Sequence, residues 1–193
     1  MPEWRSYELS DFLMFAPDTY WRLVARYNTD SWPLHLLGLG AAGLLIVLVV
    51  RCTPWASRVI AVVGALAWLQ VAWGFHWQHY AQINWGARYF AAASGFQAVL
   101  LLVFAFMPGA PRSGLRVPGL LLAFAGLSYP LVAVLAGRPW QQAEVFGLMP
   151  EPTALLTLGV LIATGATRRG LLVLVPVLSL ALGWTTLWLF TPE

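Results

Sequence analysis

The chain has 193 residues, of which 60% are hydrophobic and 10% are charged, with eleven basic and eight acidic residues. Together with a mean hydropathy of +0.71, this composition excludes an ordinary soluble globular domain, which needs more polar surface. The net charge of +3 comes from arginines in short breaks between apolar stretches. It therefore favours contact with anionic lipid headgroups over nucleic-acid binding.

Residues 1–30, the N-terminal arm, differ from the rest of the chain. Apolar side chains recur at helical spacing from Leu9 to Tyr27, charged side chains take the opposite face, and Pro17 interrupts the pattern. The pattern predicts one amphipathic helix or a pair, the second beginning near Asp18. Such an arm could lie in the outer membrane interface or pack as a lid on a helix bundle, and the pattern does not separate these placements.

Six apolar stretches follow the arm: Leu34–Val50, Val59–Trp77, Arg88–Met107, Val117–Ala136, Thr153–Thr167 and Gly170–Phe190. A helix of about 20 residues crosses a hydrocarbon core of about 30 Å. Runs such as residues 43–50 have no polar face, so a large soluble helical core is excluded. We therefore expect residues 31–193 to form one all-α domain, a polytopic membrane bundle of about six transmembrane helices.

The arginines predict which way the bundle is oriented. The basic clusters without acidic neighbours fall in the first, third and fifth breaks: Arg51 and Arg58, Arg112 and Arg116, Arg168 and Arg169. Short loops rich in arginine stay on the cytoplasmic side during insertion. We therefore expect a multi-pass protein of a bacterial inner membrane with both termini on the non-cytoplasmic side. Its partners would be the lipid bilayer and, beyond it, other membrane subunits or further copies of the chain.

Polar residues collect at the predicted outer end of the bundle. His76 and His79 are three residues apart, so on an α-helix they share nearly one face. The fifth stretch is shorter than the others, which places Glu151 either in locally thinned lipid or in a segment that dips into the protein. A carboxylate held at that depth is a candidate site with a cation as partner. The candidate ligand-binding residues are His76, His79, Tyr80, Asn84, Arg138, Glu151 and Thr153.

Two imidazoles and a carboxylate could bind a divalent metal such as zinc, so His76, His79 and Glu151 are candidate metal ligands. The alternative is that the two histidines are interfacial hydrogen-bonding residues among aromatic side chains. His35 is expected to be a satisfied residue at a helix end, although it could be a third ligand. The chain has no nucleophile-elbow pattern and no glycine-rich phosphate loop, which favours a protein that is not an enzyme.

The chain resembles an uncharacterised bacterial family of small multi-pass membrane proteins, domain of unknown function 6064. The residues that carry the resemblance are Tyr27-Asn28, Trp32-Pro33, Phe75-His76, Tyr80, Ile83-Asn84, Phe96-Gln97, Tyr129-Pro130-Leu131, Gly137, Phe146-Gly147, Pro150–Thr153 and Leu158-Gly159. His76 matches a family histidine. The family's pattern has a cysteine where this chain has Glu151, a histidine at Arg138 and an aromatic residue at His79. The resemblance implies an architecture and no activity, and these departures argue against thiolate chemistry.

Three functions remain open from the sequence. The first is a protein that binds or transports a small ion or solute through the outer polar site, although no acid or base lies at mid-membrane depth as a continuous ion path would need. The second is a non-catalytic accessory or assembly subunit that docks on a larger membrane complex. The third is a membrane protein that holds a metal or haem on His35, His76 or His79.

Overall fold

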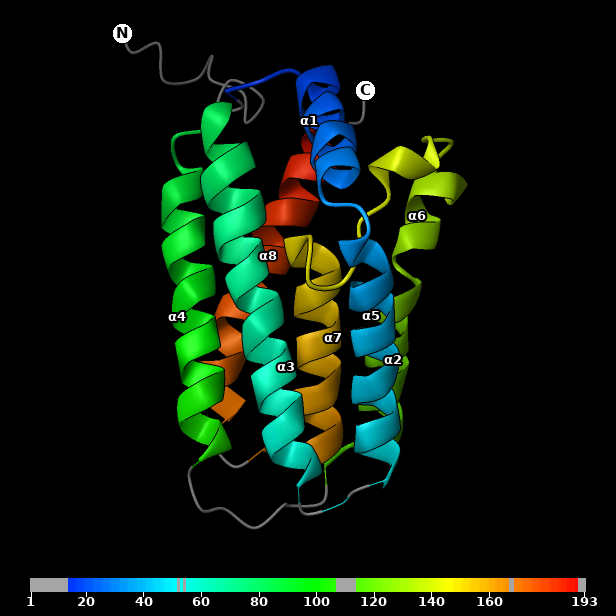
Figure 1. Ribbon diagram of the computed structural model, residues 1–193, viewed down its shortest axis with the longest axis vertical. Coiled ribbons are helices and arrows are strands. Elements are labelled where there is room, and N and C mark those ends of the chain that lie inside the picture. Colours follow the sequence, from blue (N-terminus) through cyan, green and yellow to red (C-terminus); the bar gives the residue numbers. More distant parts are fainter. Residues whose placement is uncertain (1–13, 52, 54, 107–113, 167–168, 191–193) are drawn as a thin grey trace, which may run out of the picture.

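All regular secondary structure is helical in the part that the computed structural model describes, which is residues 14–51, 53, 55–106, 114–166 and 169–190. The elements in chain order are α1 (Pro17–Asp30), α2 (Leu34–Arg51), α3 (Ala56–Gln70), η3 (Val71–His79), η4 (Tyr80–Gln82), α4 (Ala87–Ala105), α5 (Arg116–Ser128), α6 (Pro130–Leu135), η5 (Trp140–Gln142), α7 (Pro150–Thr164) and α8 (Arg169–Leu189). The predicted all-α class is therefore confirmed. The long helices run side by side, and α1 lies at one end of them (Figure 1).

Four of the described helical segments are long and apolar enough to cross a membrane: Leu34–Arg51, Ala56–Gln82, Ala87–Ala105 and Gly170–Leu189. Two other apolar helices, α5 and α7, are shorter. The predicted fourth stretch is divided because α5 ends at Ser128 and α6 begins at Pro130. Proline has no amide hydrogen and its ring clashes with the preceding turn, so the helix is interrupted there.

The shorter helix α7 is the centre of the bundle. Its residues are buried without a break from Pro150 to Leu161, and it contacts α2, α3, α5 and α8. A helix enclosed in this way can be apolar all round, which explains its lack of a polar face. The segment that precedes it, residues 143–149, is also buried. Of the two alternatives for the short fifth stretch, the structure has the chain dipping into the protein before α7 begins.

Thr153 holds this entering segment in place. Its hydroxyl donates a hydrogen bond to the carbonyl oxygen of Met149 at 2.7 Å and accepts one from the amide of Gly147 at 2.8 Å. Gly147 has a φ of 79°, a left-handed conformation that glycine adopts without steric cost. The turn therefore closes without leaving its buried polar groups unpaired, as burial requires.

Helices α5 and α7 touch backbone to backbone. A Cβ atom added at Gly159 would overlap the amide nitrogen of Ala123 and lie 2.6 Å from the carbonyl oxygen of Gly119. A Cβ at Gly119 would overlap the amide nitrogen of Ala163 in the same way. Small residues spaced four apart on both helices allow this approach, which is a common packing mode of membrane helices.

Helix α1 packs onto the end of the bundle as a lid. It buries Tyr20, Val24 and Tyr27 in a cluster with Phe75 of η3 and with side chains of the segment 143–149. The side-chain amide of Asn28 donates hydrogen bonds of 2.8 Å to the carbonyl oxygens of Gln141 and Ala143. The helix begins at Pro17, one residue before the expected Asp18. The first half of the predicted arm, residues 1–13, lies outside the described residues.

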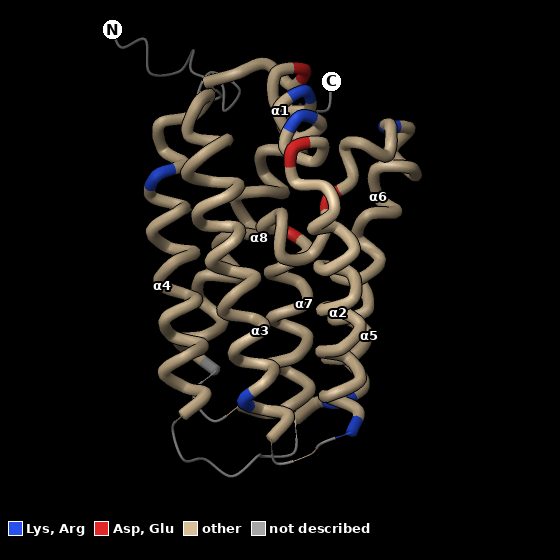
Figure 2. Tube along the Cα trace, in the orientation of Figure 1, with Lys and Arg blue, Asp and Glu red and all other residues tan. Residues whose placement is uncertain are grey.

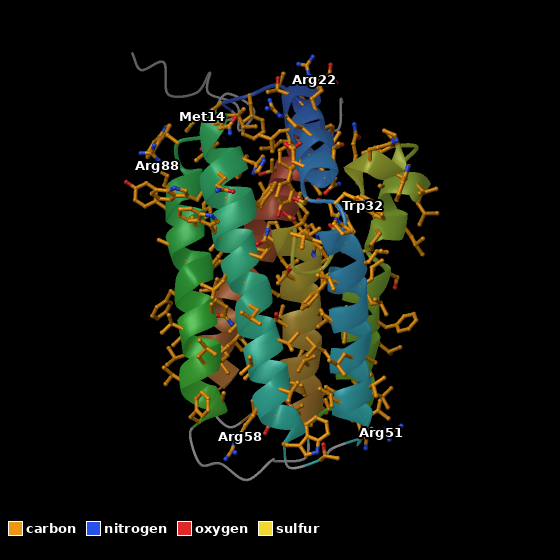
Figure 3. All side chains as sticks on the ribbon, in the orientation of Figure 1. Met14, Arg22, Trp32, Arg51, Arg58 and Arg88 are labelled. Carbon is orange, nitrogen blue, oxygen red and sulfur yellow. The ribbon has the colours of Figure 1, made fainter. Side chains whose placement is uncertain are left out.

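Most charged positions of the described residues lie toward the two ends of the bundle (Figure 2). Arg51 and Arg58 lie at one end, while Arg22 and Arg88 lie toward the other (Figure 3). Arg116 belongs with the first pair, since its guanidinium donates a hydrogen bond to the carbonyl oxygen of Val50 near the end of α2. Between the ends lies an uncharged band, which Glu151 borders from the side of α1.

We expect Gly159→Ala to destabilise the fold by about 1–3 kcal/mol, because the added methyl group forces α5 and α7 apart. The matched control is Gly95→Ala on α4, where a Cβ would meet nothing within 4 Å and alanine improves helix propensity. Thermal unfolding of both variants in mild detergent measures the difference. Equal unfolding temperatures for the two variants would show that the close α5–α7 contact is absent.

Candidate functional site

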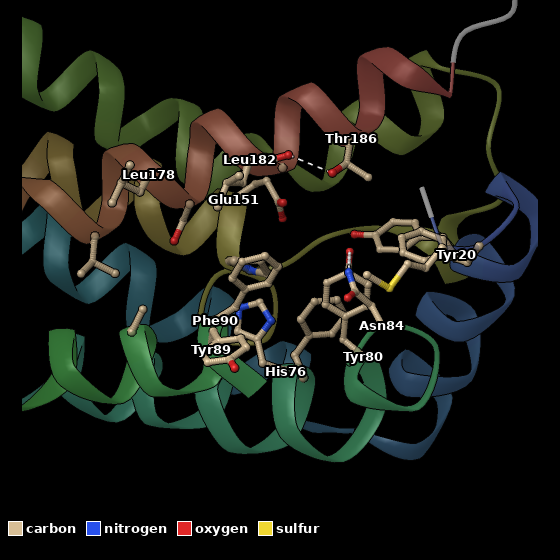
Figure 4. A pocket seen from close by; sticks show the side chains of 18 residues that line it. Tyr20, His76, Tyr80, Asn84, Tyr89, Phe90, Glu151, Leu178, Leu182 and Thr186 are labelled. Carbon is tan, nitrogen blue, oxygen red and sulfur yellow. Dashed lines mark hydrogen bonds between the residues drawn. The ribbon is translucent and has the colours of Figure 1, made fainter. Parts of the chain in front are cut away.

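A cavity of about 390 Å³ lies at the α1 end of the bundle. It is lined by side chains from η3, α4 and α8, by the first residues of α7, and by the segment that includes α1 (Figure 4). Aromatic rings and aliphatic side chains make up most of the wall. A concave, mainly apolar space with a few polar groups is the usual form of a small-molecule site.

Glu151 is the acidic residue of the cavity. It is the second residue of α7, and its side chain is 3% exposed. Its Oε2 atom has no hydrogen-bond partner, and none of the ion pairs found among the described residues includes it. The carboxylate rests against Gly183 of α8, where any Cβ atom would overlap Oε1. The bare backbone of Gly183 therefore makes the space that Glu151 occupies.

His76 lies on the opposite wall, on η3, and is 4% exposed. Its ring lies 5.3 to 6.1 Å, centre to centre, from the rings of Phe75, Phe90 and Tyr80. Its Nδ1 atom has no hydrogen-bond partner. The Tyr80 hydroxyl accepts a hydrogen bond of 3.3 Å from Asn84. The structure thus brings four candidate residues, Glu151, His76, Tyr80 and Asn84, to one cavity.

His79 does not share this cavity, contrary to the prediction from its spacing. Residues Val71–His79 form a π-helix, whose hydrogen bonds join residues five apart and whose turns are wider than those of an α-helix. A separation of three residues therefore covers a smaller part of a turn in this π-helix than in an α-helix, so His79 and His76 do not share a face. Its Nδ1–H donates a hydrogen bond of 2.7 Å to the carbonyl oxygen of Gly74, and its ring lies 4.8 Å from that of Tyr27.

The structure does not bring the three candidate metal ligands together. In the part of the chain that the structure describes, no three His, Cys, Asp or Glu side chains are grouped so that they could hold a metal ion. His76 and Glu151 remain on one cavity, but His79 is directed elsewhere. His35 of α2 does not line the cavity either; its ring lies 6.1 Å from that of Trp32.

The other two candidate residues have structural partners. Thr153 is fully buried and uses its hydroxyl in the turn before α7. Arg138 lies outside the cavity, with its Nη2 atom 3.5 Å from Oε2 of Glu144. Its guanidinium is 3.7 Å from the centre of the Trp21 ring, an attractive cation–π geometry. Arg138 therefore ties α1 to the segment before α7.

Glu144 and Tyr20 were not predicted. Glu144 is 1% exposed, although its neighbours Gln141 and Gln142 resemble an exposed loop. Tyr20 reaches the cavity from α1 (Figure 4). Burial, with a further contribution from Glu151, raises the pKa of Tyr20 well above its usual value, so its phenol is neutral. The aromatic residues of the arm at helical spacing were the only signal that could have indicated it.

We expect the free energy of unfolding to fall as the pH rises from about 4 to 7, and Glu144→Gln to weaken this dependence. Burial raises the pKa of Glu144, more than the nearby Arg138 lowers it. The folded chain therefore binds this proton more tightly than the unfolded chain, and stability is lost above the ordinary carboxyl pKa of about 4.3.

Chemical denaturation at several pH values measures this effect, whose size should be on the order of 1–3 kcal/mol across the range. The control is Asp30→Asn, which removes an exposed carboxylate. An unchanged pH slope in Glu144→Gln would rule out a raised pKa for this group.

Comparisons with known proteins identify a family but no characterised relative. No curated protein and no solved structure matches the chain. The sequence model of one family, described as a family of unknown function (DUF6064), matches residues 17–192. That range starts at the first residue of α1 and includes the four candidate residues that line the cavity. Because the match covers far more than half of its length, the chain belongs to the family of unknown function DUF6064.

Proposed function

We propose that the chain is an integral membrane protein that binds a small ion or solute in the cavity beneath α1. One observation carries the proposal: two buried polar atoms without partners, Oε2 of Glu151 and Nδ1 of His76, line the same cavity. An unpaired buried polar atom is costly, and the cost is higher for a charge. A ligand that bonds to both atoms removes that cost.

Membrane insertion is supported by the outer surface of the bundle. Large apolar side chains are exposed on its outer helices, for example Leu37 at 68%, Leu121 at 68% and Leu174 at 54%. An apolar surface of this extent around a band without charges suits contact with lipid tails. In this proposal the longer helices span the membrane, and the shorter helices α5 and α7 pack against them without having to cross its full thickness alone.

The orientation follows from the arginine positions. The end that carries Arg51, Arg58 and Arg116 would face the cytoplasm. The opposite end, with α1, the Arg138–Glu144 pair and the cavity, would face the other side. A solute would then reach the cavity from outside the cytoplasm or from the outer half of the bilayer.

The packing beyond the cavity favours binding over an open path. Toward the arginine end, the interior is filled by an apolar cluster that includes Trp68, Leu101 and Leu158. Polar groups at that depth bond within the bundle: the side-chain amide of Gln97 donates to the carbonyl oxygen of Leu172 at 3.0 Å, although its Oε1 atom has no partner. The Trp68 indole donates to Thr157 at 3.0 Å. Passage of a solute to the other end would require a rearrangement of these residues.

The orientation can be tested with the chain's single cysteine, Cys52, which follows Arg51 in the sequence. We expect a membrane-impermeant maleimide to label it only after spheroplasts of the expression host are lysed. In a Cys52→Ser background, Trp140→Cys introduces a thiol on η5 at the other end, which the same reagent should label in intact spheroplasts. The reverse pattern would contradict the orientation.

Solute binding can be tested by thermal unfolding of purified protein with a panel of sodium, ammonium, zinc, amino acids, short amines and sugars. A bound solute at 100 times its Kd stabilises the fold by about 2.7 kcal/mol. We expect at least one compound to stabilise the wild type, and Glu151→Gln or His76→Phe to abolish the effect. His79→Phe is the matched control and should retain it. A compound that stabilises all four proteins equally does not bind at this cavity, and the proposal fails if no compound behaves as expected.

A further inference from the structure

We propose that the ligand of this cavity is an amphiphile with a protonated aliphatic amine as its head and an apolar chain that leaves between α4 and α8. The inference rests on the proposed function and names the class of molecule that the cavity takes. The ammonium group would lie between Glu151 and His76, and the chain would follow α8 toward the middle of the bundle.

The positive charge of the head is inferred from Glu151, which has no ion-pair partner among the described residues. Glu151 is buried with a free carboxylate oxygen, and a buried charge needs an opposite charge close by. Arg138 is engaged by Glu144 and the Trp21 ring. In this proposal the ligand brings the positive charge that pairs with Glu151.

The hydrogen-bonding capacity of the head follows from His76. A neutral imidazole offers one nitrogen as an acceptor, and Nδ1 of His76 has no partner in the fold. An ammonium group with N–H bonds offers donors for this nitrogen and for Glu151, whereas a quaternary ammonium can donate to neither. The rings of Tyr80, Phe90 and Tyr20 on the wall add cation–π attraction for the same charge.

The apolar chain follows from the length of the cavity and its outer wall. Residues of α8 line it from Val175 to Thr186, which is roughly 16 Å at 1.5 Å per residue. Leu178 and Leu182 line the cavity (Figure 4) and are also about half exposed, at 51% and 49%. Tyr89 of α4, on the other side, is 69% exposed. In this proposal the apolar chain leaves the cavity past these exposed side chains, between α4 and α8, toward the lipid of the proposed membrane.

The test uses full-length protein in lipid nanodiscs and measures thermal stabilisation and affinity for five probes. Decylamine carries the proposed head and chain. Decanol and decanoate keep the chain but lack the positive charge, decyltrimethylammonium lacks N–H bonds, and butylamine lacks most of the chain. We expect the Kd of decylamine to be at least tenfold lower than that of each of the other four probes. The Kd values are compared after correction for the partitioning of each probe into the lipid.

Variants connect this binding to the cavity. Glu151→Gln should weaken decylamine binding at least tenfold, whereas Glu144→Gln, a change at a buried carboxylate outside the cavity, should leave it within about twofold. Leu178→Trp at the half-exposed outer wall should weaken decylamine more than butylamine. Because Leu178 is half exposed, the fold should accommodate this substitution. The Leu178→Trp variant therefore still tests the proposal if Glu151→Gln does not fold.

The outcomes separate the two proposals. If butylamine binds as tightly as decylamine, or if decanol or decanoate does, the amine amphiphile is overturned while solute binding stands. If amines fail but another solute of the wider panel binds in a manner that depends on Glu151, the ligand class is wrong and the proposed function holds. If Glu144→Gln and Glu151→Gln lose decylamine equally, the binding is not located at this cavity. If no compound binds, both proposals fall.

Discussion

The burial of α7 from its first residue is the constraint on which the rest of the structure depends. Because the chain enters the protein through residues 143–149 before this helix starts, its polar N-terminal residues lie inside the bundle. Glu151 is thereby removed from water and set against Gly183. The backbone contact of α5 with α7 at Gly119 and Gly159 fixes the helix in this place. The cavity is the space that remains between this helix end, η3, α4 and α8.

Helix α1, the lid, holds the segment before α7 in place. Helix α1 covers the entering segment and is fastened to it by Asn28 and by the contact of Trp21 with Arg138. Trp21 and Glu144 together engage the guanidinium of Arg138. The fold thus separates two buried carboxylates by function: Glu144 has a cation within the chain, and Glu151 has an open cavity in front of it.

Much of the helix layout could be predicted, because long apolar runs leave a chain few alternatives to helices. The start of α1 was predicted to within one residue, because Pro17 interrupts the apolar pattern of the arm. The π-helix at Val71–His79 could not be predicted, since no residue pattern marks it, and it separated His79 from His76. The burial of Glu144 was hidden because its polar neighbours resemble a loop in water. The sequence placed Glu151 and His76 at the same end of the bundle, but that both line one cavity depends on tertiary packing.

Hydrogen exchange of the segment before α7 tests the central claim most directly. The amides of Gly147, Leu148 and Met149 are hydrogen-bonded within a buried turn, so their exchange should be as slow as that of the middle of α7. Trp85, which is exposed in the connection between η4 and α4, provides the fast reference in the same protein. Protection at the level of α7 is the predicted result. Exchange of residues 147–149 as fast as this reference would place the start of α7 in water and contradict the account of Glu151.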